Sequence, residues 1–360
     1  MFLERLKNFL MRGFAVDLGT ANTLIYARGR GVVLNEPTAI ASNKFAGEII
    51  AIGRDAISML GREPRDTVVH RPLKDGTIAD QDIAEQMLRC FFRRAGIKKK
   101  GKLFLQVVVG LPSSATEIDR RAVREAARRT GISKVHIVEE GLAAAIGAGV
   151  PVDSPNATMV VDIGGGTTDI TVVGSSSIII SKSLKVAGDE MNEAIINYVH
   201  KHHEVLLSER IAELVKLELG AAFHPKKKKP MQVIGKKITD GAPKEILLTN
   251  EEVFEALDKT LQTLVNGVRS VIEQVQPQVI SDIYRNGIVL TGGGALLSGL
   301  DARLKSEVGI SVSCAANPLE AVVLGAGHML DNAEMLYRFR IQEEAPDWEV
   351  LQIRDYDYAN

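Results

Sequence analysis

The stretch MVVDIGGGTTDITVV, residues 159–173, decides the fold that we expect of this chain. Its apolar start predicts a buried strand that ends at Asp162, turns through three glycines and two threonines, and resumes as a second strand. Glycine allows positive φ and a close approach of the backbone to a ligand, so the N–H groups of such a turn can converge on a phosphate. We therefore expect a phosphate-binding hairpin; the alternative is a glycine-rich hairpin with a capping aspartate.

The carboxylate at the mouth of this hairpin adds a second requirement. Asp162 would repel a phosphate unless a cation lay between the two groups. Mg²⁺ is the natural candidate, because this hard ion keeps several waters and bridges carboxylate to phosphate. The sequence thus predicts a phosphate site that works with magnesium.

A similar pattern occurs much earlier, in FAVDLGTANTLIY at residues 14–26. There a strand leads to Asp17, and a short turn with Gly19 and Thr20 precedes the next strand. A repeated strand–Asp–Gly–Thr–strand unit predicts two similar domains that face each other and clasp a phosphate chain between two hairpins. The alternative is two unrelated turns.

A third glycine-rich element, IVLTGGGALLSGL, occupies residues 288–300. A strand that ends at Thr291 and leads through glycines into a helix lets a flat or charged ligand approach the backbone. The dinucleotide fingerprint GxGxxG is not matched, because position 297 is Leu. A GxxxxGK near-match at residues 96–102 lacks the following Ser or Thr, so it is not a P-loop.

Length and composition predict a globular protein of two domains. The chain has 360 residues, 45% of them hydrophobic, and a net charge of −1 that gives no global indication of nucleic-acid binding. Cys90 and Cys314 are far apart and fit neither a disulfide framework nor a zinc site, which suits a reducing cytoplasm. No apolar run approaches the roughly 18 residues of a membrane span.

Strand and helix patterns alternate, which predicts α/β layers around largely buried sheets. One helix start is expected from Ser114 and Glu117, which have capping-box spacing, and Gly131 should end that helix. The expected strands are 14–18, 23–27, 31–34, 105–111, 135–138, 158–163, 168–173, 177–185, 287–291 and 310–314. The expected helices are near 80–95, 117–130, 140–148, 189–203, 208–221, 250–275, 298–307 and 319–337.

Together these motifs make the chain resemble the MreB family of bacterial actin homologues, within the actin–Hsp70–sugar-kinase ATPase superfamily. The resemblance covers residues 13–335, with the motifs in order and at the family's spacing. Its main segments are VDLGTANTLIY, VEEGLAAAIGAG (138–149), MVVDIGGGTTDI, AGDEMNEAIINYV (187–199), GIVLTGGGALL (287–297) and NPLEAVVLGAG (317–327), supported by VLNEPTAIA, RPLKDGTIAD and AELVKLELG.

The resemblance implies an α/β, actin-like ATPase fold, with two RNase H-like lobes of two subdomains each around a nucleotide cleft. Lobe I would span 13–150, with subdomain IB at about 35–76 and the rest as IA, closed by a C-terminal helix at about 326–340. Lobe II would span 151–325, with IIB at about 186–249 and the rest as IIA. Residues 341–360 form an acidic tail that we expect to be disordered.

The resemblance also implies ATP and Mg²⁺ as cofactors and assigns roles to residues. Asp17 and Asp162 would hold hydrated Mg²⁺, and Glu140, helped by Thr167, would orient the attacking water. A proline usually follows the two glutamates in this family, whereas this chain has Gly141. The phosphates would be cradled by Thr20, Ala21, Asn22, Gly164, Gly165, Gly166 and Thr167, the ribose and base reached by Glu213 and Lys216, and the adenosine pocket bounded by Gly292, Gly293, Gly294 and Ala295.

The N-terminal segment MFLERLKNFLMRG has an apolar face with basic residues elsewhere. A short helix of this kind at residues 1–12 can lie in a membrane interface and is drawn to anionic lipid. One copy would bind weakly, but a filament that presents many copies would attach firmly. The alternatives are a helix packed on its own domain, or a frayed end. The apolar face consists of Phe2, Leu3, Leu6, Phe9 and Leu10.

Two further clusters indicate solvated surface rather than a site. His200, His203 and Glu204 share a helical face, but HExxH is absent. The segment PKKKKP, 225–230, predicts a basic loop that could contact lipid or a partner.

The function expected from the resemblance is a polymerising cytoskeletal ATPase on the inner face of the cell membrane. Its partners would be other copies of itself, the membrane surface and the membrane-bound elongation proteins of peptidoglycan synthesis, with no nucleic acid. The alternatives are a nonpolymerising scaffold or chaperone-type ATPase, and a small-molecule kinase of the same superfamily.

Overall fold

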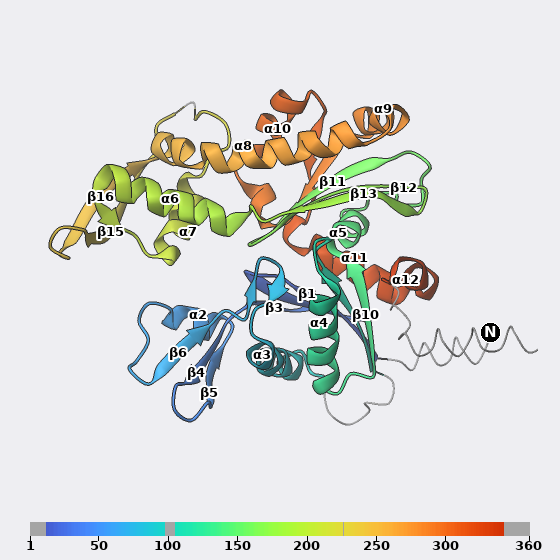
Figure 1. Cartoon of the computed structure of the whole chain (residues 1–360), viewed down its shortest axis with the longest axis horizontal. Helices are drawn as coiled ribbons and strands as arrows, with labels where there is room; N and C mark the ends of the chain where they lie inside the picture. The colour runs from blue at the N-terminus through green and yellow to red at the C-terminus, as the bar shows by residue number, and fades with distance from the viewer. Residues whose placement is uncertain (1–11, 98–104, 226, 342–360) are drawn as a thin grey trace, which may run out of the picture.

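The computed structural model describes residues 12–97, 105–225 and 227–341. Figure 1 shows two bodies, one above the other, that meet near α5 and α11. The lower body holds the elements from β1 to α4, and the upper body holds those from β11 to α10. Of the described helices, none combines the length and apolar character that crossing a membrane requires.

The first sheet of five described strands has the order β10-β9-β1-β2-β3. β1 pairs in parallel with β9, and β9 with β10, while β1–β2 and β2–β3 are antiparallel. Helices α3 (Gln81–Arg94) and α4 (Glu117–Arg129) bury apolar side chains against one face. The strands are β1 (Arg12–Leu18), β2 (Asn22–Ala27), β3 (Gly31–Pro37), β9 (Leu105–Leu111) and β10 (Lys134–Glu139).

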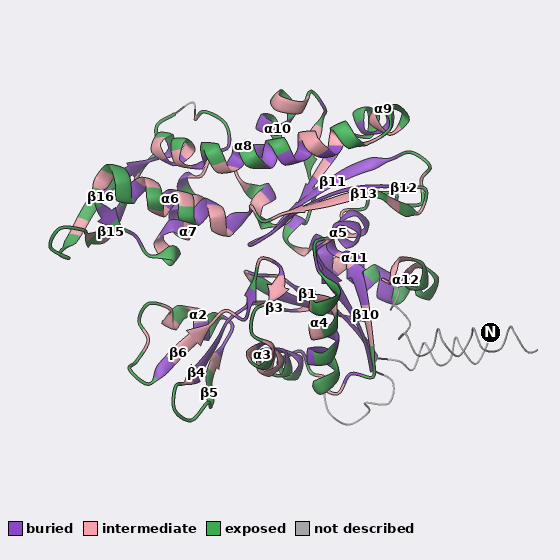
Figure 2. Ribbon diagram, viewed as in Figure 1, coloured by how far each residue is buried: buried purple, intermediate pink, exposed green. Residues whose placement is uncertain are grey.

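The second sheet repeats this topology in the order β18-β17-β11-β12-β13, with the same pattern of parallel and antiparallel pairs. Figure 2 shows that its central strands are buried, the polar residues within them included. Helices α6 (Gly188–His203) and α8 (Asn250–Gln274) contribute to its core. The strands are β11 (Thr158–Ile163), β12 (Thr168–Gly174), β13 (Ser177–Leu184), β17 (Ile288–Thr291) and β18 (Val312–Cys314).

Two helices, α5 (Glu140–Gly147) and α11 (Ala321–Asp331), lie between the sheets and carry the chain from one to the other. They cross at backbone contact: a Cβ added at Gly147 would lie 1.8 Å from the Ala321 carbonyl oxygen, and one at Gly325 would lie 1.8 Å from that of Ala143. Only glycine fits at either point, so these glycines fix how closely the two helices approach.

Smaller elements extend both bodies. Most residues of these elements are half-exposed or exposed. The lower body adds β4 (Ile40–Asn43), β5 (Ile49–Ile52), α2 (Arg54–Met59), β6 (Thr67–His70), β7 (Leu73–Lys74) and β8 (Thr77–Ile78). The upper body adds β14 (Val205–Leu206), α7 (Glu209–Leu219), β15 (Pro230–Lys237), β16 (Pro243–Thr249), α9 (Pro277–Asn286), η2 (Gly293–Leu296), α10 (Leu300–Val308) and η3 (Pro318–Glu320); α12 (Ala333–Phe339) follows α11.

Two local predictions were wrong. The N-cap of α4 is Thr116, not Ser114: the Thr116 side chain accepts from the Asp119 N–H, and Asp119 accepts from the Thr116 N–H. A turn closed by the Ala115 N–H and the Pro112 carbonyl occupies the preceding residues, so the helix begins later. The glycines after Thr291 lead into the 3₁₀ helix η2 rather than directly into an α-helix.

Candidate functional site

The two glycine-containing hairpins face each other at the junction of the two bodies. A Cβ added at Gly165 would lie 2.8 Å from the Ala21 Cβ, and one at Gly166 would lie 2.8 Å from the Thr20 hydroxyl oxygen. A third segment contacts the first hairpin, because the Gly76 N–H donates to Thr20 Oγ1 at 3.0 Å. The backbones of both turns are therefore exposed to one shared space.

Asp17 and Asp162 hold equivalent places near the ends of the central strands of the two sheets. Asp17 pairs with Gly110 on β9, and Asp162 pairs with Thr291 on β17. The Thr291 hydroxyl donates to Asp162 Oδ1 at 2.7 Å. Burial, with the nearby charge of Asp162, raises the pKa of Asp17 to about 7. Burial also raises the pKa of Asp162 to about 7, although the hydrogen bond from Thr291 opposes the rise.

Glu140 opens helix α5 beside these carboxylates. Its side chain is only 7% exposed, and its Cγ would lie 3.2 Å from a Cβ at Gly110, the residue opposite Asp17. Burial raises the pKa of Glu140 well above its usual value, and the charges of Asp169, Asp17 and Asp162 raise it further. The fold thus gathers several acids where one strand end of each sheet meets α5.

Asp169 is a member of this group that the sequence reasoning missed. It lies on β12, opposite Asp162, and is 1% exposed. Its Oδ1 accepts from the Ser113 N–H at 3.0 Å and from the Ser113 hydroxyl at 3.1 Å, and its Oδ2 accepts from Ser183 at 3.3 Å. A charged residue within the buried run TTDITVV was the available signal.

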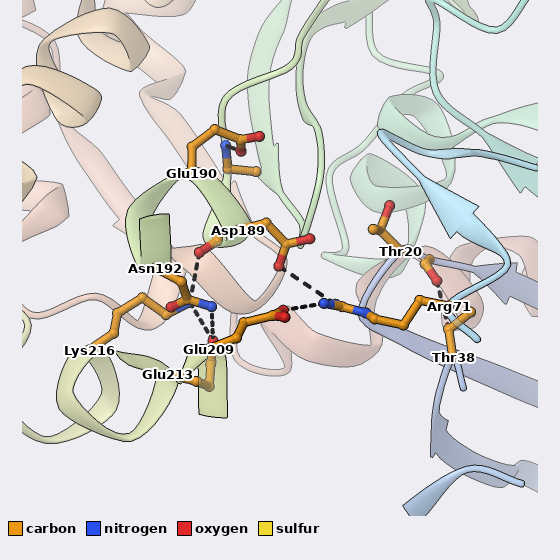
Figure 3. A network of polar contacts seen from close by, with 12 residues as sticks. Thr20, Thr38, Arg71, Asp189, Glu190, Asn192, Glu209, Glu213 and Lys216 are labelled. Carbon is orange, nitrogen blue, oxygen red and sulfur yellow. Dashed lines mark hydrogen bonds and ion pairs between the residues drawn. The ribbon is translucent and has the colours of Figure 1, made fainter. Parts of the chain in front are cut away.

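A polar group on α6 and α7 lies at another part of the same space (Figure 3). Glu213 Oε2 accepts from Lys216 Nζ at 2.7 Å and from Asn192 Nδ2 at 2.7 Å. Lys216 also donates to the Gly188 carbonyl at 3.0 Å. Glu213 and Lys216 were predicted from the sequence, whereas Asn192 was not.

A cavity of about 830 Å³ unites these groups, a size suited to a nucleotide-sized ligand. Ala295 does not line it; this residue is buried and belongs to the core of the second sheet. The predicted residues that line the cavity are Asp17, Thr20, Ala21, Asn22, Glu140, Asp162, Gly164, Gly165, Gly166, Thr167, Glu213, Lys216, Gly292, Gly293 and Gly294.

The carboxylates of Asp17 and Asp162 are the groups at this site that could hold a cation. Among the described residues, no group of three or more His, Cys, Asp and Glu side chains is arranged to hold a metal. Burial and the charge of Asp162 make the Asp17 carboxyl costly to ionise, and a bound divalent cation would offset that cost. A cation that keeps most of its waters and takes oxygen ligands from a phosphate matches this arrangement.

An ion-pair cluster connects the two bodies at the cavity (Figure 3). Arg71, between β6 and β7 of the lower body, pairs with Asp189 on α6 at 3.7 Å and hydrogen-bonds Glu209 on α7. All three residues line the cavity. None was predicted from the sequence, because the partners lie more than 100 positions apart in the chain.

The remaining predictions have different outcomes. Phe2, Leu3, Leu6, Phe9 and Leu10 lie outside the described residues, as does the tail after 341. His203 is part-buried and pairs with Glu252 at 2.8 Å, rather than forming part of a solvated face.

The comparisons with known proteins agree on one family. A family model described as MreB/Mbl protein matches residues 11–338. The cell shape-determining protein Mbl of Bacillus subtilis is 40% identical over 327 residues, which cover 90% of this chain and 97% of the relative. The cell shape-determining protein MreB of Escherichia coli K12 is 41% identical over 337 residues, covering 92% and 97%.

Solved structures give the same result for the fold. The crystal structure of MreB 5 of Spiroplasma citri bound to AMPPNP has a TM-score of 0.86 and 33% identity, covering 90% of this chain and 97% of that one. The MamK double helical filament has a TM-score of 0.76 at 21% identity, covering 89% and 99%, and at that identity it supports the fold alone.

Proposed function

The chain belongs to the MreB/Mbl family and has the actin-like ATPase fold, and on that premise we propose that it is a cytoskeletal ATPase. It binds Mg-ATP between two lobes and polymerises into membrane-associated filaments that control rod shape by organising peptidoglycan synthesis. The observation that carries this proposal is the pair of facing hairpins, with Asp17 and Asp162 at equivalent ends of two sheets above one cavity.

In this proposal the lobes are divided as the family resemblance implies, at about residue 150. Backbone N–H groups of the hairpins bind the phosphates, and Asp17 and Asp162 hold Mg²⁺ through water. When bound, Mg²⁺ supplies the positive charge that neither hairpin carries, because neither contains a lysine. Glu213 and Lys216 bind the sugar and base. A relative crystallised with AMPPNP supports this occupancy.

Hydrolysis is assigned to Glu140, aided by Thr167. A buried carboxylate with a raised pKa can align a water and accept its proton, which is the help that phosphoryl transfer to water needs. We expect Glu140→Ala to keep ATP binding and lose phosphate release, with binding measured by calorimetry and release by a phosphate assay. Hydrolysis at the wild-type rate in this variant would remove Glu140 from the mechanism.

Membrane attachment is assigned to the segment before β1. Its five apolar residues would bury in the lipid interface of the inner face of the cell membrane, and assembly would multiply a weak single contact. Deleting residues 2–11 should abolish co-sedimentation with anionic liposomes while leaving polymerisation intact. Undiminished co-sedimentation would show that another part of the chain binds lipid.

One experiment tests the whole proposal. The purified protein is sedimented with anionic liposomes in Mg-ATP, in Mg-ADP and without nucleotide, and the pellets are viewed by negative-stain electron microscopy. Filaments on lipid in Mg-ATP are the expected result, because head-to-tail contacts that do not close generate filaments. Nucleotide-bound monomers under every condition would reject the cytoskeletal function and favour a scaffold or a kinase, which substrate screening would separate.

A further inference from the structure

The carboxylate of Glu213 is held asymmetrically. Both of its donors, Asn192 Nδ2 and Lys216 Nζ, bond to the same oxygen, Oε2, each at 2.7 Å. Within the described residues, Oε1 accepts no hydrogen bond, and the side chain is 43% exposed at the cavity. One oxygen is therefore fixed by the protein, and the other remains available to a ligand that carries hydroxyl donors.

The two donors differ in how firmly they are themselves fixed. Lys216 is anchored a second time, by the Gly188 carbonyl at the start of α6. Asn192 is 3% exposed and belongs to the buried side of the same helix. A short amide on a packed helix has few alternative positions, so it defines where the Glu213 carboxylate lies more strictly than a long lysine side chain can.

Asn192 also leaves an atom unsatisfied. Its Oδ1 is buried and finds no hydrogen-bond partner among the described residues. A buried acceptor without a donor lowers stability, so an amide is a poor choice here if packing were its only role. The hydrogen bond from Nδ2 to Glu213 is the interaction in the structure that offsets this cost.

We propose that Asn192 is a positioning residue that aims the free oxygen of Glu213 at the sugar hydroxyls of the bound nucleotide, and so sets a preference for ribonucleotides over 2′-deoxyribonucleotides. The inference rests on the proposed function, because it requires a nucleotide in the cavity. A carboxylate oxygen held in place accepts from a hydroxyl at little cost in conformational entropy, whereas a mobile carboxylate loses that advantage.

The test compares the affinities for ATP and dATP by calorimetry, with Mg²⁺ present and at protein concentrations that prevent assembly. The wild type should bind ATP more tightly than dATP. Asn192→Leu keeps a similar side-chain volume but removes the donor. It should reduce the ATP-to-dATP affinity ratio by about tenfold, or to one if the wild-type ratio is smaller than ten. Asn192→Ala provides a second variant if the leucine disturbs folding. Asn197→Ala, an exposed change on the same helix, should keep the wild-type ratio.

The outcomes separate the inference from the function on which it rests. A wild type that binds neither nucleotide rejects the proposed function. A wild type that binds both, with an unchanged ratio in both Asn192 variants, overturns the role of Asn192 and leaves the proposed function standing. If the Asn192 variants bind ATP and dATP equally more weakly and unfold at a lower temperature, Asn192 has only a structural role. This result also overturns the inference.

Discussion

At the scale of single residues, Gly141 and Thr171 fit each other across the junction of the two bodies. A Cβ added at Gly141 would lie 1.9 Å from Thr171 Oγ1 and 2.8 Å from Thr171 Cβ. Thr171 is fully buried on β12, and its hydroxyl lies 2.9 Å from that of Ser181. The threonine therefore occupies the space that any side chain at 141 would need, so glycine is the residue that fits at this position.

This fit predicts coupled effects of substitution. Gly141→Ala should destabilise the protein by about 1–3 kcal/mol through overpacking, as measured by urea unfolding. Thr171→Ala should recover part of that loss in the double variant, because it removes the closest atom. Strictly additive effects would contradict the contact. Because Gly141 follows Glu140, phosphate release should fall more than ATP affinity does.

The carboxylate pair predicts how stability varies with pH when no cation is present. Asp17 and Asp162 have pKa values of about 7 in the fold against 3.8 normally, so the folded state binds more protons between these limits. The contribution of these two groups to the free energy of unfolding should be fully present below pH 3.8 and should be lost as the pH rises through 7. The loss should be at most about 1.4 kcal/mol per pH unit for each group.

The isosteric variant Asp162→Asn provides the control, because it mimics the protonated form. In EDTA at pH 8 it should unfold at a higher denaturant concentration than the wild type, whereas Mg-ATP should stabilise the wild type and not the variant. An Asp162→Asn protein that is less stable than the wild type under metal-free conditions would show that the carboxylate is not under electrostatic strain.

The site residues that belong to a local sequence pattern were predicted, and those that depend on distant partners were not. Asp17 and Asp162 are the next-to-last residues of their strands and precede glycine-containing turns, and the local pattern was enough to single them out; both line the cavity. Arg71, Asn192 and Asp169 carry no such pattern. Their importance depends on partners brought close by the fold, such as Ser113 for Asp169, and those partners lie far away in the sequence.

At the scale of elements, the start of α4 shows how local hydrogen bonds select a boundary. Thr116 and Asp119 form a reciprocal capping box, with bonds of 2.8 and 3.3 Å. We expect Thr116→Ala to lower stability by about 1 kcal/mol in thermal or urea unfolding, because the Asp119 N–H loses its side-chain acceptor and the Asp119 carboxylate loses the Thr116 hydroxyl. Ser114→Ala should have almost no effect. An equal loss for both would argue that the helix starts earlier.

The strands of the two large sheets could be predicted from the sequence. Most of them contain a short run of apolar or β-branched residues, and all ten were expected close to their observed positions. The small sheets were missed for two reasons. Strands β4, β5 and β6 have only four residues each and β14 has two. Strands β15 and β16 have eight and seven residues, but both begin with Pro and carry Lys, residues that are depleted in strands. Helix α9 was missed as well, although Pro277 at its first turn is a known start signal.

At the scale of the whole molecule, two sheets of the same topology are joined by a narrow crossing and by contacts around the cavity. The crossing is the backbone contact of α5 with α11 at Gly147 and Gly325. The ion pairs of Arg71 with Asp189 and Glu209 connect the two bodies at the cavity, away from this crossing. Such an arrangement allows the two bodies to rotate about the α5–α11 crossing, while the ion pairs of Arg71 hold them together at the cavity.

Removing the ion pairs of Arg71 should make nucleotide exchange faster. Arg71→Ala should release etheno-ATP about three to ten times faster than the wild type in stopped-flow fluorescence, because two partly exposed ion pairs together contribute about 1 kcal/mol. Release from the wild type should accelerate more steeply with added salt than release from Arg71→Ala, because the variant lacks the ion pairs of Arg71 that salt screens. The matched control is Arg65→Ala, an exposed arginine just before β6 that lies outside the cavity lining. If Arg65→Ala accelerated release equally, or if Arg71→Ala left both the rate and its salt dependence unchanged, the ion pairs of Arg71 would not be what holds the two bodies together around the nucleotide.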